Sequence, residues 1–172
     1  DLNYYTYGLR IYKNMPLIEP VETKENLRIE ELVIVVDTSY STSGELVKKF
    51  LRETFTILSE TDSFFRKRKI HIIQCDELVH SDITVTGDTD IDILINNFEL
   101  AGGGNTDFRP AFEYVNNLID TGEIKKLQGL LYFTDGKGKY PKKKMPYNTA
   151  FVFIDKLSET AVPAWAMKVS LE

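Results

Sequence analysis

The chain has 172 residues, of which 42% are hydrophobic and 27% are charged. This balance is that of a single α/β domain with a buried core, and it excludes a disordered chain and a fibrous repeat. The 26 acidic and 21 basic residues give a net charge of -5, so we do not expect a nucleic-acid partner, which would favour a basic face.

The cysteine content and the length of the apolar runs indicate the cellular environment of the chain. The single cysteine, Cys75, cannot form an internal disulfide, and a thiolate zinc site would need further cysteines. We therefore expect a reducing, cytoplasmic environment. The longest apolar runs are of strand length and fall far short of the roughly 20 residues that cross a bilayer, so no membrane span is expected.

The two ends of the chain predict a fragment of a longer protein. The first residue is Asp1 rather than Met, and residues 1–30 have the weak periodicity of an extended lead-in or linker remnant. We interpret Leu171 and Glu172 as a remnant of an expression vector. The domain proper is then expected to span residues 31–170.

The first half of the chain predicts a strand, a helix and a strand pair. Leu32–Val36 is a continuous apolar and mostly β-branched run, typical of a strand buried on both faces. Apolar residues recur at helical spacing from Leu46 to Leu58, which predicts a helix of about four turns. Ile70–Cys75 predicts the next strand, and Leu78–Val85 predicts its antiparallel partner at the sheet edge.

The second half continues this alternation after an ambiguous segment. Asp88–Leu100 fits either a short strand or a short helix, whereas Phe108–Ile119 predicts an amphipathic helix that tolerates Pro110 in its first turn. A Lys- and Pro-rich loop follows the next strand. The predicted strands of this half are Gly129–Phe133, Phe151–Ile154 and Trp165–Val169. The whole pattern predicts a doubly wound, mostly parallel α/β sheet with helices on both faces and an antiparallel edge strand.

Polar residues follow the predicted strands at the point where each strand ends. Asp37 to Ser41 follow the first strand, Gly104 to Asp107 lie in the central loop, and Thr134 to Gly136 follow a later strand. In an open α/β sheet, ligands bind beyond the carboxyl ends of the parallel strands. These segments are therefore the candidate site.

The side chains in these segments offer oxygen ligands only. Such a set suits Mg²⁺ first and Mn²⁺ or Ca²⁺ next, because no thiolate or imidazole is present to select zinc or copper. If one carboxylate acts through water, the ion stays electrophilic and can accept a carboxylate from another protein. The predicted metal ligands are Asp37, Ser39, Ser41, Thr106 and Asp135.

The same motifs resemble a known family. The D-x-S-x-S pattern from Asp37 to Ser41, the Gly-Gly-Asn-Thr loop from Gly103 to Thr106, and Thr134 to Gly136 resemble the metal-ion-dependent adhesion site of von Willebrand factor type A (VWA) domains. The resemblance covers residues 31–169. It implies the Rossmann-like VWA fold and a role in protein interaction.

A narrower resemblance concerns the segments around these motifs. Ile72 to Asp76, Gly104 to Pro110 and Leu131 to Gly136 are similar to the VWA-like domain at the C-terminus of predicted bacterial metallopeptidases. In that family an upstream domain carries an H-E-x-x-H zinc motif, and a MoxR-type AAA+ ATPase is the implied partner. Two departures stand out, since Tyr40 and Asn105 occupy positions where glycine is common. Tyr40 would crowd the metal or add an aromatic rim.

Several nearby residues have both a functional and a structural interpretation. Asp76 follows the strand next to the first one, and it is a candidate for holding the metal ligands in place without binding the metal itself. Asp107 is interpreted as the N-cap of the following helix. The lysines from Lys137 to Lys144 form either a solvated loop or a basic lip that steers an acidic partner. Residues interpreted as structural are His71, Cys75, His80 and Arg109.

Two classes of function are compatible with these residues. The first is a non-catalytic docking module that binds an Asp or Glu of a protein partner through a divalent cation. The second is a hydrolase or phosphoryl-transfer enzyme that uses a metal at the same crevice. A haloacid-dehalogenase-type phosphatase would need an aspartate where Ser39 stands, and no phosphate-binding glycine loop is present. We therefore expect this fragment not to be an enzyme, and any peptidase activity to belong to a missing upstream region.

Overall fold

The computed structural model describes residues 30–39, 43–59, 68–153 and 162–170. The predicted lead-in up to residue 29, the two C-terminal residues, and Tyr40 and Ser41 of the candidate site lie outside the described residues. The proposed division of the chain into lead-in, domain and vector remnant stays a prediction.

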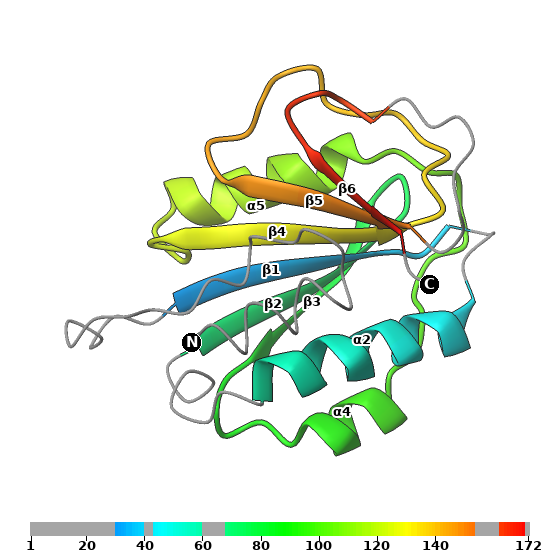
Figure 1. The fold of residues 1–172 in the computed structure, drawn as a ribbon, viewed down its shortest axis with the longest axis vertical. Helices are drawn as coiled ribbons and strands as arrows, with labels where there is room; N and C mark the ends of the chain where they lie inside the picture. Colours follow the sequence, from blue (N-terminus) through cyan, green and yellow to red (C-terminus); the bar gives the residue numbers. More distant parts are fainter. Residues whose placement is uncertain (1–29, 40–42, 60–67, 154–161, 171–172) are drawn as a thin grey trace.

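A six-stranded sheet forms the centre of the fold, with the strand order β3-β2-β1-β4-β5-β6 (Figure 1). All neighbouring strands are parallel except β2 and β3, which pair antiparallel at one edge. This arrangement confirms the predicted mostly parallel sheet with an antiparallel edge strand. The strands are β1 (Glu30–Asp37), β2 (Arg68–Cys75), β3 (Val79–Val85), β4 (Leu127–Thr134), β5 (Asn148–Phe153) and β6 (Met167–Ser170).

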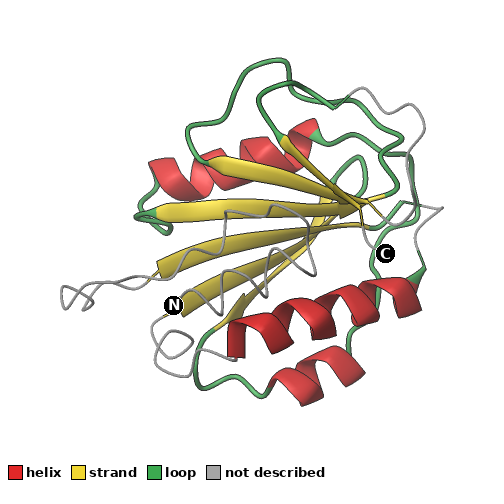
Figure 2. Ribbon diagram, in the orientation of Figure 1, coloured by secondary structure: helices red, strands yellow, loops and turns green. Residues whose placement is uncertain are grey.

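Helices cover both faces of the sheet (Figure 2). The helices α2 (Gly44–Ser59) and α4 (Ile91–Asn96) lie on one face, and α5 (Arg109–Asp120) lies on the other. The short helix α4 settles the ambiguity of the segment from Asp88 to Leu100, and it begins where the Asp90 carboxylate accepts a hydrogen bond from the N–H of Ile93. None of these helices combines the length and apolar character that a bilayer crossing requires.

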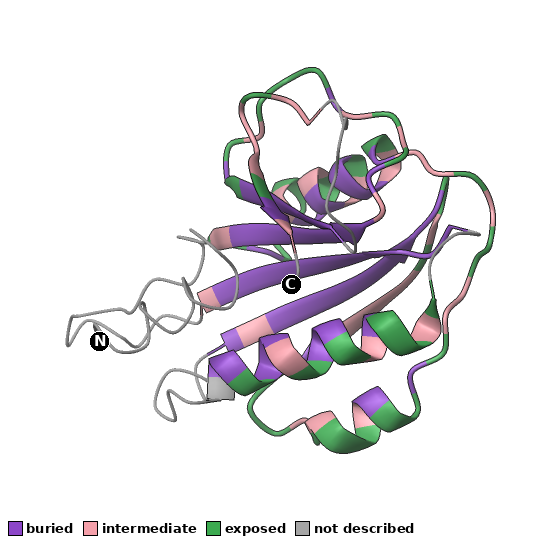
Figure 3. Cartoon of the chain, turned by 45° about the vertical axis from the view of Figure 1, so that its right-hand side comes forward, coloured by how far each residue is buried: buried purple, intermediate pink, exposed green. Residues whose placement is uncertain are grey.

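The alternation of side chains along β1 divides the core into two layers. Figure 3 shows this strand in purple, as buried, along nearly its whole length. Leu32, Ile34 and Val36 pack in the cluster beneath α2, whereas Val33 and Val35 pack in the cluster beneath α5. Successive side chains of a strand point to opposite faces, so a central strand is apolar along the stretch that is covered on both sides, here Leu32 to Val36. The continuous apolar run in the sequence therefore predicts β1 correctly.

Buried carboxylates close the amino-terminal edge of the sheet. Glu31 is buried and accepts hydrogen bonds from the N–H groups of Lys125 and Lys126 at 2.7 and 2.8 Å. Beside it, Glu30 and Arg68 form an ion pair at 3.0 Å. These contacts tie β1 to β2 and to the residues directly before β4.

The chain changes direction at β1. From β1 it passes through α2 to β2 on one side, and it later returns through α5 to β4 on the other side of β1. Because α2 and α5 cover opposite faces, the carboxyl ends of β1 and β4 form a topological switch point, the usual ligand position in an open α/β sheet.

The apolar face of α2 differs at one position from the face predicted from spacing. Leu46 was expected to lie in the apolar stripe, but it is 40% exposed, whereas Leu51 is fully buried. Leu46 lies in the first turn of the helix, where Val47, one residue later, takes the buried position.

The two leucines of α2 provide a matched test of this packing. We expect Leu51→Ala to lower the free energy of unfolding by about 2–5 kcal/mol, because it leaves a cavity beneath the helix. Leu46→Ala should change it by less than about 1 kcal/mol, because an exposed side chain loses little contact. Urea denaturation followed by circular dichroism measures both values, and equal losses would contradict the assignment.

Candidate metal-binding site

The site centres on Asp37, the last residue of β1, whose side chain is fully buried. Its Oδ1 accepts a hydrogen bond from the N–H of Ser39 at 2.8 Å, and its Oδ2 accepts one from the hydroxyl of Thr134 at 2.5 Å. The Thr134 oxygen in turn accepts the N–H of Gly136 at 3.0 Å. The carboxylate therefore joins the ends of β1 and β4 at the switch point.

The environment of Asp37 disfavours its negative charge. Burial raises the pKa of this carboxyl group, and the nearby charge of Asp135 raises it further, while hydrogen bonds from Thr134 and Ser39 only partly oppose the effect. In the described part of the chain, no basic side chain forms an ion pair with Asp37. A bound cation would offset this cost, because an opposite charge nearby favours the ionised form.

Asp135 is the second carboxylate at this edge. It follows β4 directly and is partly exposed, and its Oδ1 accepts the N–H of Lys137 at 3.1 Å. The turn at Gly136, whose φ is 84°, redirects the chain immediately after it. Two acidic side chains thus meet beyond the ends of adjacent parallel strands, one buried and one open to solvent.

The loop that carries Thr106 is fastened to the ends of β1 and β2. The N–H of Gly103 donates to the carbonyl of Thr38 at 2.9 Å. Asp76, directly after β2, accepts the N–H of Gly104 on its carboxylate at 3.0 Å and the N–H of Asp107 on its carbonyl at 3.3 Å. These bonds hold Thr106 between two anchored positions.

Asp76 is the anchor on which this loop depends. Its other carboxylate oxygen accepts the N–H of Leu78 at 2.8 Å and lies 2.8 Å from Nε2 of His80. Burial alone would raise the pKa of Asp76, but the hydrogen bonds from Leu78, Gly104 and His80 outweigh it and hold the pKa below its ordinary value. The carboxylate is therefore engaged with protein groups on both oxygens, which suits a supporting role.

The first glycine of the loop is required by close contact. Gly102 has a φ of 127°, and a Cβ atom there would lie 2.6 Å from Oγ1 of Thr38 and 2.9 Å from Oδ2 of Asp76. Neither the backbone conformation nor the available space admits a side chain. The structural need for glycine here lies one residue before the Gly103 with which the predicted motif begins.

Four of the five predicted metal ligands lie in the described residues, and all four are at the carboxyl-terminal edge of the sheet. Asp37 and Asp135 interact electrostatically, Ser39 bonds to Asp37, and the Thr106 loop contacts Thr38. Asn105 is exposed on the same loop. Ser41 and Tyr40 lie outside the described residues, so their contribution stays a prediction.

Asp107 differs from its interpretation in the sequence. The N-cap of α5 is Phe108 rather than Asp107. The Asp107 carboxylate still accepts the N–H of Arg109 at 3.0 Å, and it also binds the guanidinium of Arg109 at 2.6 and 2.9 Å. The carboxylate thus binds both the backbone and the side chain of Arg109, and α5 begins one residue later than the predicted cap implies. The predicted structural role of Arg109 agrees with this contact.

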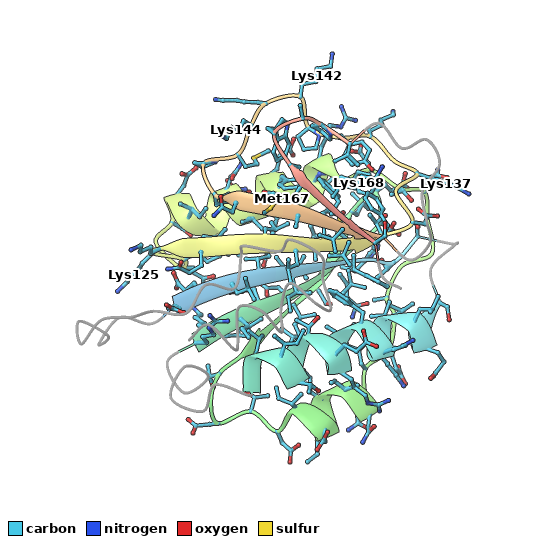
Figure 4. All side chains as sticks on the ribbon, in the orientation of Figure 1. Lys125, Lys137, Lys142, Lys144, Met167 and Lys168 are labelled. Carbon is cyan, nitrogen blue, oxygen red and sulfur yellow. The ribbon has the colours of Figure 1, made fainter. Side chains whose placement is uncertain are left out.

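The predicted basic lip is smaller than five lysines. Figure 4 shows Lys137 beside the carboxyl ends of the strands, whereas Lys142 and Lys144 lie on the part of the loop that passes over the sheet toward the start of β5. Lys139 stays near the site, because it pairs with Asp107 in an isolated parallel bridge. Closeness in sequence to Asp135 did not predict closeness in space, because this loop extends from the carboxyl-terminal edge of the sheet to the opposite edge.

Some functional contacts were not predictable as such. Thr134 belongs to the predicted site segments but not to the predicted ligands, yet its hydroxyl fixes the central carboxylate. The clue in the sequence is a hydroxyl residue at the final position of a buried strand next to an acidic residue. The bridge between Asp107 and Lys139 has no local sequence signal.

The donor chemistry fits a hard cation. Across the described ranges, no group of three or more His, Cys, Asp or Glu side chains could hold a metal ion. Any cation between Asp37 and Asp135 would therefore need hydroxyl or water ligands as well. Ser39 and Thr106 are the predicted hydroxyl ligands that the structure describes, and oxygen ligands of this kind suit Mg²⁺, Mn²⁺ or Ca²⁺.

The anchoring role of Asp76 predicts a pH-dependent loss of stability. Because its folded-state pKa lies below the unfolded value, Asp76 stabilises the fold above pH about 4, and this contribution disappears as the pH falls through the folded-state pKa. Asp76→Asn should cost about 1–3 kcal/mol at pH 7, since the N–H of Gly104 loses a charged acceptor.

Urea denaturation at pH 7 and pH 3 measures this difference, which should shrink at the lower pH. The control is Glu77→Gln at the neighbouring exposed position, which should stay within about 0.5 kcal/mol of the wild-type protein at pH 7. A loss for Asp76→Asn that is the same at both pH values would contradict the role of its charge.

Comparisons with known proteins agree with this architecture. Residues 32–172 match the sequence model of a family described as VWA-like domain (DUF2201). Among solved structures, the chain is similar to the crystal structure of the SpRpn10 VWA domain, with a TM-score of 0.54 and 15% sequence identity over 83% of this chain and 88% of that chain. At this identity the likeness concerns the fold alone. No curated protein gives a significant match.

Proposed function

This chain belongs to the VWA-like domain (DUF2201) family, a common type of protein-interaction module, and we propose that it binds an acidic side chain of a protein partner through a divalent cation. The observation that carries the proposal is the buried Asp37 carboxylate, which has Asp135 beside it and a raised pKa. A charge that is costly to bury alone is stabilised when a cation binds.

The candidate ligands come from three separate loops. Asp37 and Ser39 follow β1, Thr106 lies in the loop anchored by Asp76, and Asp135 follows β4. Ser41 completes the predicted set from the sequence. Mg²⁺ is the expected ion, with Mn²⁺ or Ca²⁺ as alternatives, and when bound it would supply an electrophilic position for a partner carboxylate.

The protein groups around the ligands fix their geometry. The hydroxyl of Thr134 holds one oxygen of Asp37, and the N–H of Ser39 holds the other. A carboxylate oxygen can accept more than one interaction, so these hydrogen bonds are compatible with a metal ligand role for Asp37. The N–H of Lys137 orients Asp135 in the same way. The site is therefore preorganised by backbone and hydroxyl donors.

The wider setting is also part of the proposal. We infer that the chain itself is not an enzyme and that it docks a partner presenting Asp or Glu, for which a MoxR-type AAA+ ATPase is the candidate implied by the family resemblance. A cytoplasmic location is supported by the single cysteine, Cys75, which is buried and unpaired. A zinc peptidase domain upstream would belong to the parent protein.

Metal titration tests the central step. We expect Mg²⁺ and Mn²⁺ to bind saturably to the wild-type protein in isothermal titration and to raise its melting temperature, as ligand binding to the folded state requires. Asp37→Ala and Asp135→Ala should abolish both effects, because each removes a charged ligand. Circular dichroism must show that both variants remain folded.

A suitable control is Asp88→Ala, since Asp88 is exposed in the segment before α4. This variant should bind metal as the wild-type protein does. Metal binding that survives the loss of Asp37 would place the ion elsewhere and contradict the proposal. The same conclusion would follow if the wild-type protein failed to bind up to millimolar ion.

Partner chemistry can be tested with peptides. Peptides selected from a random library for binding in Mg²⁺ and release by EDTA should contain Asp or Glu, and replacing that residue with Asn or Gln should abolish binding. Charge reversal at Lys137 and Lys139 should slow association of such a peptide by roughly tenfold at low ionic strength. Stopped-flow fluorescence measures this rate.

The matched control reverses the charge of Lys142 and Lys144, which gives the same change in net charge away from the site. This variant should associate with the peptide at nearly the wild-type rate. Equal slowing by the two double variants would show that only net charge matters and that no local basic rim guides the partner.

A further inference from the structure

Two loops of the candidate site are joined directly to each other. Residues 104–108, which carry Thr106, lie against residues 136–140, which follow Asp135. Asp107 and Lys139 form a parallel bridge, and the N–H of Phe108 donates to the carbonyl of Lys139 at 3.1 Å. The ring of Tyr140 also packs on the ring of Phe108, with centroids 4.7 Å apart. Because of these contacts, a displacement of one loop will displace the other.

Gly138 lies at the point of closest approach between these loops. A Cβ atom at this position would lie 2.7 Å from Cγ2 of Thr106 and 2.8 and 2.9 Å from two ring carbons of Phe108. Distances under 3.0 Å are essentially never found for a real Cβ atom, so a side chain here requires a neighbour to move.

The two neighbours differ in their freedom to move. Phe108 is fully buried, and its ring packs against Tyr132 and Phe151 at centroid distances of 5.0 and 5.6 Å. It also directly precedes the first turn of α5. Thr106 is partly exposed and belongs to a loop outside the regular elements. Strain introduced at residue 138 is therefore relieved most easily by displacing Thr106.

We propose that Gly138 is a positioning residue for the metal site, because its lack of a side chain lets Thr106 occupy its place beside the Asp135 loop. This inference rests on the proposed function, in which Thr106 supplies a hydroxyl ligand. Gly138 is not itself a metal ligand in this proposal. It acts through the methyl group of Thr106, so a single added carbon atom should weaken metal binding while every ligand is retained.

The experiment compares Gly138→Ala with the wild-type protein in two measurements. Isothermal titration with Mn²⁺ should show roughly ten- to 100-fold weaker binding, the range expected when a group that orients a ligand is disturbed. In EDTA, without any metal, the methyl resonance of Thr106 should shift in a methyl NMR spectrum. The second measurement reports on the contact independently of metal binding.

A double variant separates the Thr106 contact from the Phe108 contact. Thr106→Ser removes Cγ2 and keeps the hydroxyl, so Gly138→Ala should weaken Mn²⁺ binding much less when measured relative to Thr106→Ser alone. This double-mutant cycle isolates the coupling between the two positions. An undiminished effect in the Thr106→Ser background would overturn the inference.

Gly122→Ala controls for a general loss of stability. Gly122 follows α5 at its far end, has a φ of 81°, and has open space around its Cβ position. Its substitution should lower the melting temperature because of the backbone conformation, yet leave Mn²⁺ affinity unchanged. If Gly122→Ala weakens binding as much as Gly138→Ala, stability alone explains the effect and the inference is overturned.

The remaining outcomes distinguish the inference from the function on which it rests. Absence of Mn²⁺ binding by the wild-type protein would overturn the proposed function and this inference with it. Normal binding by the wild-type protein and no binding by Asp37→Ala, together with unchanged affinity of Gly138→Ala, would overturn the positioning role alone. An unshifted Thr106 methyl resonance in Gly138→Ala would do the same.

Discussion

The hydrogen bond from the Thr134 hydroxyl to the Asp37 carboxylate is the contact on which the arrangement of the candidate site depends. It joins the last residues of β1 and β4, which are neighbours in the sheet but 97 positions apart in the chain. Because α2 and α5 cover opposite faces, the ends of β1 and β4 form the topological switch point at which open α/β sheets bind ligands. A buried carboxylate here is costly to ionise, and the same cost makes the position receptive to a cation.

Much of the fold could be predicted from the sequence because burial on both faces leaves a strong local signal. A central parallel strand such as β1 is apolar along the stretch from Leu32 to Val36 that both layers of helices cover, whereas the edge strand β3 is mostly half-buried or exposed. The order of polar residues at strand ends likewise predicts that Asp37 and Asp135 meet, since parallel strands end at one edge. Such signals are local in sequence and need no knowledge of loop paths.

The errors arose where loop geometry decides the outcome. The turn of Asp107 toward Arg109 displaced the predicted N-cap, and the path of the loop after β4 carried Lys142 and Lys144 away from the site. Gly138 was overlooked for the same reason, because its importance comes from contacts with residues about 30 positions earlier, Thr106 and Phe108. No periodicity or motif encodes contacts between two loops of irregular conformation. They become visible only when the whole sheet has placed the loop ends.

The strand order has a consequence for how the chain acquires its structure during synthesis. β1 pairs with β2 on one side, but its other side stays unpaired until Leu127–Thr134 has been made. Until then the growing chain exposes an apolar strand edge, which is the kind of surface that promotes aggregation. Pairing across such a sequence separation is slow because a long loop must close first. The contact between Asp37 and Thr134 therefore cannot form before β4 has been synthesised.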